Sequence, residues 1–381
     1  MPFTTIDLTK AVTGVLPDAN ANYSTPRVNA NPLIINGDMA VAQRGTSVTG
    51  VGNGDTGYNS LDRWRFSEGG DNSTVFTMSQ DTDVPTGQGF ANSLKMDVTT
   101  ADASPGSSDS MFLQQRFEGQ DLQLLKKGTS SAEKITVSFW VKSSKTGTYI
   151  LEVQDSDNTR NCSQSYTVSS ADTWEKKVVV FPADTTGALG DDNGNSFEIN
   201  WWLLAGTDFT SGTLATSFAS RTNSNRAVGQ VNIGDNTSNN FYMTGCQMEV
   251  GEYTASTIPP FQHESFDNNL ERCQRYFFKN NSVANMPMAS GVCNGTTNAR
   301  AVYYFPKTMR ANPSLDKSSS TDFKVQIGGS VHDTTNVAFY YQNLNQALLY
   351  VDVSSGLTDG KGCLVIDDGG SNIFISGSAE L

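Results

Sequence analysis

The chain has 381 residues, and 26 Lys and Arg stand against 39 Asp and Glu, which gives a formal net charge of −13. This acidity repels phosphate backbones and anionic lipids, so we expect no nucleic-acid partner and no membrane insertion. Aromatic residues make up 10% of the chain and glycines number 34, a composition that argues against disorder and favours a folded, loop-rich, mostly β protein. The length predicts two domains.

Residues 1–30 show no sustained periodicity, and prolines at Pro17 and Pro26 would interrupt any element there. They lack the basic and apolar segments of a secretory signal. We interpret them as an extended arm, which is either a loose terminus or a peg that becomes ordered on a partner.

Residues 31–262 carry strand signals separated by turn-rich loops, and we expect a jelly roll or β-sandwich there. Two of the strands, Ile135–Val141 and Thr148–Val153, flank a turn and predict an antiparallel hairpin. One short helix is expected at Asp121–Lys127, with Asp121 as its cap. The other expected strands are Thr74–Met78, Leu94–Val98, Met111–Phe117, Glu175–Phe181, Phe197–Leu204 and Phe241–Val250.

Residues 263–381 begin with apolar side chains at helical spacing, which predicts a short helix over Phe266–Phe278 with Asp267 as its N-cap and Glu271 near the capping-box position. Short strands follow, so we expect a smaller β-sandwich-like domain. These strands are Ala301–Phe305, Phe323–Ile327, Val337–Tyr341, Ala347–Val353, Gly362–Ile366 and Ile373–Gly377.

Catalytic motifs are missing from the sequence. The two histidines, His263 and His332, lie near no nucleophile motif, and the five cysteines form no CxxC pair. We therefore expect buried reduced thiols, no catalytic residues, no metal, no cofactor and no enzyme activity.

Two tryptophans lie on the more polar side of their strands, because successive side chains of a strand point to opposite faces. Trp202 shares its side with Glu198 and Asn200, and Trp140 lies beside threonine, serine and lysine. Each tryptophan could pack under a loop, meet another subunit or stack on a sugar, and the pattern alone leaves the three open. Trp140, Trp202, Glu198 and Asn200 are the candidate ligand residues.

A set of short strings resembles bacteriophage tail-fibre proteins that have a carbohydrate-binding-module-like jelly roll and a small β domain at the tip. The resemblance covers about residues 31–381, and it depends on the order of the strings along the chain. They are NPLIINGDM (Asn31–Met39), AQRGTS (Ala42–Ser47), LDRW (Leu61–Trp64), VSFWVKS (Val137–Ser143), TGCQMEVG (Thr244–Gly251), LERCQRYF (Leu270–Phe277), MRANP (Met309–Pro313) and SAEL (Ser378–Leu381).

The resemblance implies a homotrimeric fibre on the virion surface, made in the host cytoplasm, that attaches the particle to a host glycan. Residues 1–30 would hold it to other tail or capsid proteins through apolar side chains, namely Phe3, Ile6, Leu8, Val12, Val15 and Leu16. Two alternatives stay open: a head or tail decoration fibre without a receptor, and a depolymerase, which would need a pair of carboxylates flanking a glycosidic bond.

Overall fold

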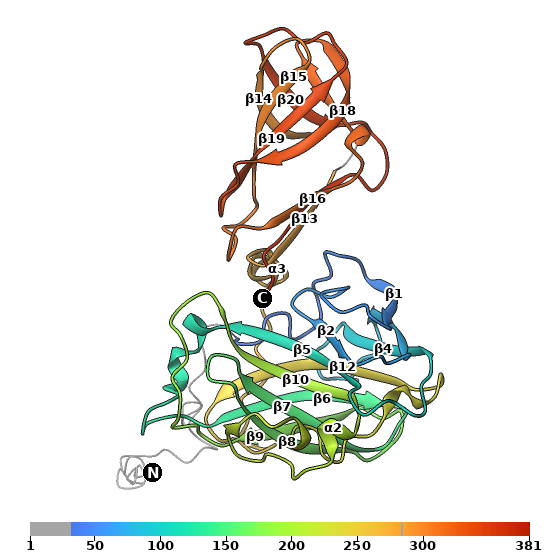
Figure 1. Ribbon diagram of the computed structural model, residues 1–381, viewed down its shortest axis with the longest axis vertical. Coiled ribbons are helices and arrows are strands. Elements are labelled where there is room, and N and C mark those ends of the chain that lie inside the picture. The colour runs from blue at the N-terminus through green and yellow to red at the C-terminus, as the bar shows by residue number, and fades with distance from the viewer. Residues whose placement is uncertain (1–31, 283–284) are drawn as a thin grey trace, which may run out of the picture.

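The computed structural model describes residues 32–282 and 285–381, which form two parts stacked along the long axis of the molecule (Figure 1). The larger part, which we call the body, contains β1–β12, and the smaller part contains β13–β21. The prediction of an all-β, antiparallel fold with a jelly-roll body is confirmed.

The body consists of two six-stranded antiparallel sheets. Sheet one has the order β1-β3-β4-β12-β6-β9, and sheet two has the order β11-β8-β7-β10-β5-β2. The strands are β1 Ser47–Gly52, β2 Arg65–Gly69, β3 Val75–Asp81, β4 Ser93–Thr100, β5 Ser110–Glu118, β6 Ile135–Ser143, β7 Gly147–Asp155, β8 Arg160–Val168, β9 Glu175–Phe181, β10 Asn195–Ala205, β11 Ala219–Ser220 and β12 Asn240–Val250.

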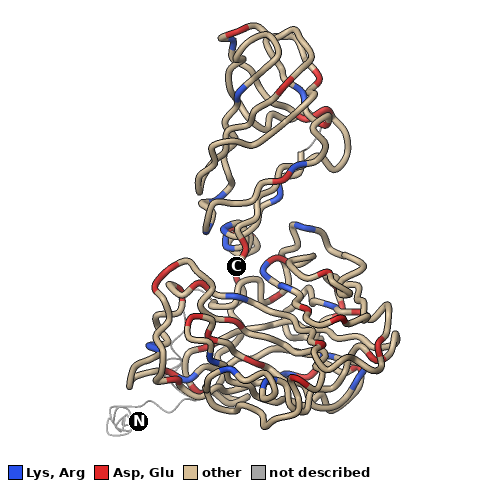
Figure 2. The backbone as a smooth tube through the Cα atoms, viewed as in Figure 1, with Lys and Arg blue, Asp and Glu red and all other residues tan. Residues whose placement is uncertain are grey.

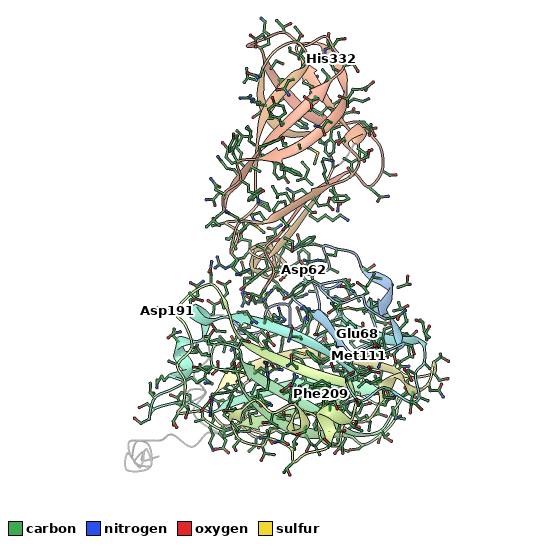
Figure 3. The ribbon with its side chains drawn as sticks, viewed as in Figure 1. Asp62, Glu68, Met111, Asp191, Phe209 and His332 are labelled. Atoms are coloured by element: carbon green, nitrogen blue, oxygen red, sulfur yellow. The ribbon has the colours of Figure 1, made fainter. Side chains whose placement is uncertain are left out.

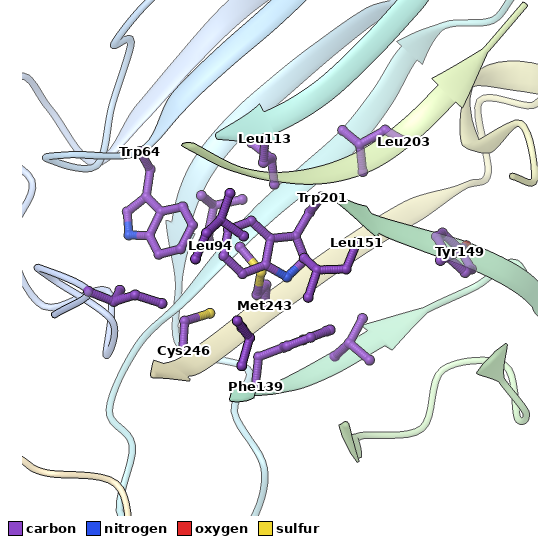
Figure 4. Close-up of a cluster of buried hydrophobic side chains, with 14 of the residues drawn as sticks. Trp64, Leu94, Leu113, Phe139, Tyr149, Leu151, Trp201, Leu203, Met243 and Cys246 are labelled. Atoms are coloured by element: carbon purple, nitrogen blue, oxygen red, sulfur yellow. The ribbon is translucent and has the colours of Figure 1, made fainter. Parts of the chain in front are cut away.

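The inner faces of the two sheets supply one continuous apolar core. Trp201 of β10 lies at its centre, with ring centroids 5.3 Å from Trp64 and 5.8 Å from Phe139 (Figure 4). The expected alternation in β10 is borne out as far as Leu203, since Phe197, Ile199, Trp201 and Leu203 all enter this core. Leu204, expected on the opposite face with Trp202, enters the core as well, because the strand register shifts between Trp202 and Leu204.

The predicted hairpin of β6 and β7 is wrong. β6 pairs with β9 and β12 in sheet one, whereas β7 pairs with β8 and β10 in sheet two. The connection between them leads from sheet one to sheet two, and Ser144 exchanges hydrogen bonds with Asn240 at the start of β12. Two strands with one apolar face each can bury those faces by stacking in opposite sheets, and their alternation is then the same as in a hairpin.

Helices are short and few in the described residues. The helix expected near Asp121 is a 3₁₀ helix, η1 Gly119–Leu125, without a side-chain cap. The remaining short turns are α2 Thr207–Thr210, η2 Asn223–Asn225, η3 Ile233–Asp235 and η4 Ser320–Asp322.

The helix expected at the start of the smaller part is α3 Phe266–Gln274, and its N-cap differs from the predicted Asp267. Ser265 caps it, because the Ser265 hydroxyl accepts from the Asn268 amide at 3.3 Å. Glu271 does not complete a capping box and pairs instead with Lys307 at 2.7 Å. The helix ends before Phe278 because Phe277 already begins β13.

The smaller part combines a three-stranded sheet, β13-β21-β16, with a closed six-stranded barrel, β14-β15-β19-β18-β17-β20. The sequence predicted a small β domain resembling a sandwich, and the structure shows that most of its strands close into a barrel. The strands are β13 Phe277–Asn281, β14 Pro287–Cys293, β15 Asn298–Tyr304, β16 Ser314–Lys317, β17 Phe323–Ile327, β18 Ser330–Tyr340, β19 Gln346–Val353, β20 Gly362–Asp367 and β21 Phe374–Ser378.

Buried charges join the two parts, and Figure 2 shows residues of both signs gathered where they meet. Arg63 of the body is 1% exposed, pairs with Glu380 and lies 3.5 Å from the ring centroid of Tyr276. Glu118, also buried, accepts two bonds from Arg275 at 2.6 and 2.8 Å and one from Tyr276 at 2.6 Å. We call these contacts the junction. Because its charges are paired and hydrogen-bonded, it fixes the smaller part on the body.

Asp62 lies at the edge of the junction, on the side of the body that faces the smaller part (Figure 3). Burial raises the pKa of this carboxyl to about 6, against the opposing effects of Arg44 and Gln43.

Candidate saccharide-binding surfaces

The structure brings three of the four candidate ligand residues together, but beneath the surface. Trp202 is fully buried, Asn200 is fully buried and Glu198 is 7% exposed. All three lie on the outer side of β10 in sheet two, where the segment 206–227 folds over Trp202 and packs Phe209, Leu214 and Ala227 into the same cluster. The Trp202 ring lies 5.0 Å from Phe112 and 5.5 Å from Phe209, which Figure 3 labels on this side of the body. Trp202 therefore packs under a loop, which is one of the three arrangements left open by the sequence.

Glu152 of β7 is the centre of a hydrogen-bond network under the same segment. Its carboxylate accepts two bonds from Arg226 at 2.8 and 3.0 Å, one from Asn200 at 3.2 Å and one from the Trp202 indole at 3.1 Å. Burial alone would raise the pKa of Glu152, but Arg226 and these bonds hold it below its ordinary value. The network keeps a buried anion charged and paired, and it binds the covering segment to the sheet.

Glu198 joins this network through a shared amide. The Gln114 Nε2 atom donates to both Glu198 and Asn200 at 2.8 Å, and Arg116 lies 3.3 Å from Glu198. Because these polar atoms are used internally, Glu198 and Asn200 serve the packing of the body in this structure.

Trp140 lies on the other sheet and is partly exposed. It stands on the outer side of β6, paired in register with Thr244 of β12 and Lys176 of β9. Loops cover part of this side of sheet one, since Thr244 donates to the Asn92 carbonyl at 2.7 Å and Gln247 donates to the Pro259 carbonyl at 2.8 Å. Trp140 lies on the part of the sheet between these two covered positions and β9.

Two residues that we did not select from the sequence lie on this side as well. Trp174 is partly exposed and precedes β9, and its ring centroid is 6.1 Å from that of Tyr242. The Trp174 indole donates to Asp83 at 2.9 Å, and Lys142 pairs with Asp83 while lying 4.2 Å from the Tyr242 ring centroid. We call Trp140, Trp174, Tyr242, Lys142 and Asp83 the tryptophan face.

One of the two missed residues, Tyr242, carried a usable signal in the sequence. Tyr242 alternates with the core residues Phe241 and Met243, so it had to point outward. Trp174 lies in a turn directly before a strand, where nothing in the sequence shows which sheet it will cover.

Electrostatics give the tryptophan face mixed charge. Burial of Asp83 would raise its pKa, but the bonds from Lys142 and Trp174 hold it below the ordinary value. Burial lowers the pKa of Lys176. Aromatic rings beside fixed donors and acceptors can hold a ring that is apolar on its faces and rich in hydroxyl groups at its edge.

The histidines and cysteines lie in packed positions. His263 packs against Phe90 and Phe261 with ring centroids 5.2 and 4.8 Å away, and His332 lies over Gly356. All five cysteines are buried free thiols, as expected. Among the described residues, no group of three His, Cys, Asp or Glu could hold a metal ion, and no helix there is long and apolar enough to cross a membrane.

The proposed attachment residues, Phe3, Ile6, Leu8, Val12, Val15 and Leu16, lie outside the described part of the chain.

Comparisons with known proteins give structural likenesses only. No family model matches the sequence, and no curated protein does. The enzymatically active domain of bacteriophage CBA120 tailspike protein 4 matches 49% of this chain at 16% identity and a TM-score of 0.27, and the match spans 19% of that chain.

A putative sugar-binding protein from Bacteroides thetaiotaomicron matches 58% of this chain and 100% of its own at 13% identity and a TM-score of 0.32. A family 11 carbohydrate-binding module of Clostridium thermocellum matches 52% of this chain and 92% of its own at 11% identity and a TM-score of 0.26. At these scores the likenesses carry no weight for function, which has to be inferred from the residues of the chain itself.

Proposed function

We propose that this chain is a non-catalytic, saccharide-binding fibre protein of a bacteriophage particle, and that the tryptophan face of its body contacts the host glycan. The observation that carries the proposal is the placement of Trp140 and Trp174, both partly exposed, beside the Lys142–Asp83 pair on one side of sheet one. A pyranose ring can stack its C–H face on an indole while its hydroxyls bond to the exposed Asp83 carboxylate, which the buried Lys142 holds in place.

The place on a particle is supported by the ordered strings that resemble phage fibres. In this proposal residues 1–30 attach the chain to the virion, and three copies associate. Several linked copies would raise the avidity for a glycan surface by ~10²–10⁴-fold over one site. Deleting residues 1–30 should leave a folded protein that no longer enters particles. Particles that still incorporate the truncated chain would refute this attachment.

The saccharide proposal is tested with a glycan array probed by the labelled full-length chain. The wild type should bind a defined subset of glycans, and Trp140→Ala with Trp174→Ala should lower that binding at least tenfold, as expected for two lost stacking rings. Phe266→Ala is the matched control, because Phe266 is 57% exposed but lies on α3, away from this face.

Three results would contradict the proposal. Equal glycan binding by the double variant and the wild type would show that the tryptophan face does not contact the glycan. Array silence together with normal adsorption of particles that lack the protein would favour a decoration fibre. Release of reducing sugar from host envelope by the purified chain would show catalysis.

A further inference from the structure

The barrel has an outer face on which exposed tyrosines gather. It spans β15, β19 and β18, which are neighbours in the barrel. We call this surface the tyrosine face, and its members are Tyr304, Tyr340, Tyr341, Tyr350 and Arg300. None of these residues belongs to the tryptophan face or to the junction.

Strand register brings these side chains together. Tyr350 of β19 pairs with Arg300 of β15 on one side and with Ala338 of β18 on the other. In the next row Leu348 pairs with Val302 and with Tyr340. The intervening residues of all three strands point into the barrel core, so these rows face outward.

Three of the rings are exposed, and Tyr340 contacts both Tyr341 and Tyr350. Tyr341 is 88% exposed, Tyr304 is 68% exposed and Tyr340 is 51% exposed. Tyr340 packs edge-on against Tyr350 at 5.4 Å, and its ring centroid is 6.3 Å from that of Tyr341. Rings held by one another present a rigid surface, which reduces the entropy lost on binding.

The backbone at Tyr341 gives a second, independent observation. Its φ is +45°, in the left-handed region that a bulky side chain rarely adopts. The cost of this conformation is not repaid by burial, because the side chain is the most exposed of the large apolar residues in the described chain. Strain that is retained to display a side chain in solvent is a reason to look for a ligand.

Polar groups with fixed orientation border the rings. Asp352 accepts from Asn298 at 2.7 Å and from Asn336 at 3.1 Å, in the row directly beside Tyr350. The Arg300 guanidinium lies 5.2 Å from the Tyr350 ring centroid. One cation and one anion make this surface neutral within a chain of net charge −13.

We propose that the tyrosine face is a second saccharide site that binds a neutral pyranose ring. The ring would stack on Tyr340 and Tyr341, and its hydroxyls would bond to Arg300, Asn336 and the tyrosine hydroxyls. A neutral polyol fits the balanced charge of the surface, and the planar amide, carboxylate and guanidinium groups suit paired hydroxyls. The inference extends the saccharide binding proposed for the body to the barrel, but it uses separate residues and can be tested separately.

The experiment uses the full-length chain with the body site removed by Trp140→Ala and Trp174→Ala. Saturation-transfer NMR is recorded with four probes at millimolar concentration: the methyl glycosides of glucose, galactose, mannose and N-acetylglucosamine. We expect transfer to at least one probe, and an affinity loss of about tenfold or more when Tyr340→Ala and Tyr341→Ala are added. Phe266→Ala in the same background should bind like its parent.

Folding is checked independently, since the thermal transition should stay within a few degrees for substitutions at exposed tyrosines. The proposal would be overturned if none of the four probes showed saturation transfer. It would also be overturned if saturation transfer were equal with and without the two tyrosines. Sedimentation supplies the other decisive result: self-association that disappears in the tyrosine variant, without glycoside binding, would make this face an interface between copies. Both proteins that are compared lack Trp140 and Trp174. A saturation-transfer signal that disappears when Tyr340 and Tyr341 are replaced therefore belongs to the barrel, whether or not the tryptophan face binds a glycan.

Discussion

The burial of Trp202 makes a prediction that separates packing from ligand binding. Replacing Trp202 by alanine removes a ring that contacts Phe112, Phe209 and the Arg226 guanidinium. Replacing a large buried aromatic side chain by alanine lowers the free energy of unfolding by about 3–5 kcal/mol. For a domain of this size each kcal/mol lowers the melting temperature by about 2–4 °C, so the body transition should fall by roughly 6–20 °C.

Scanning calorimetry measures this shift, and two variants separate its causes. Trp202→Phe keeps an aromatic ring but loses the indole bond to Glu152, so it should cost only about 1–2 kcal/mol. Trp140→Ala, at a partly exposed position of the opposite sheet, should cost about 1 kcal/mol. The reasoning is refuted if Trp202→Ala melts like the wild type while its glycan binding is lost, because that outcome belongs to an exposed sugar platform.

Three further changes probe buried charge. Burial raises the pKa of Glu249 to about 7. Because the folded chain holds this proton more tightly than the unfolded chain, the protonated carboxyl stabilises the fold fully below the ordinary glutamate pKa, and this stability is lost as the pH rises through 7. Glu249→Gln should therefore melt like the wild type at pH 4, below the ordinary pKa of a glutamate, and be more stable than the wild type by about 1–3 kcal/mol at pH 8. A variant that melts like the wild type at both pH values would contradict this. Arg226→Ala leaves the buried Glu152 carboxylate without its cation and should cost about 3–5 kcal/mol in urea unfolding, and adding Glu152→Gln should restore part of the loss. Glu380→Gln removes the charge that faces a buried arginine at the junction, so small-angle scattering should show a wider range of shapes, whereas Glu252→Gln, in an exposed pair, should change nothing.

Much of the fold could be predicted because strand alternation is a local property. The range Glu175–Phe181 matches β9, and Phe323–Ile327 matches β17. β8 was missed because Arg160–Val168 is mostly polar, and two of its polar residues, Asn161 and Ser163, are buried through contacts that only the folded sheets supply. Pairing is a nonlocal property, which is why the partners of β6 and β7 could not be derived from their own residues.

The candidate site was harder to predict because the sequence shows on which side of a strand a residue lies but not what covers that side. Trp140 and Trp202 have similar neighbours along their strands. Trp202 is buried because the segment 206–227 returns over β10, and Trp140 stays partly exposed because the loops over sheet one stop at Thr244 and Gln247. The tyrosine face was missed for a related reason, since Arg300, Tyr350 and Tyr340 become neighbours only through the register of three strands.

The junction determines what two saccharide sites on one chain could achieve. Two sites on a flexible link gain avidity from many arrangements, whereas two sites on a rigid body gain it only if the glycan spacing matches. The buried pair of Arg63 with Glu380 and the partly exposed pair of Arg275 with Glu118 fix the smaller part on the body, so the distance between the tryptophan and tyrosine faces is set by the fold. A chain built in this way would discriminate between glycans by the spacing of their sugars. Loosening the junction with Glu380→Gln should then lower selectivity among long glycans while leaving the binding of single methyl glycosides unchanged.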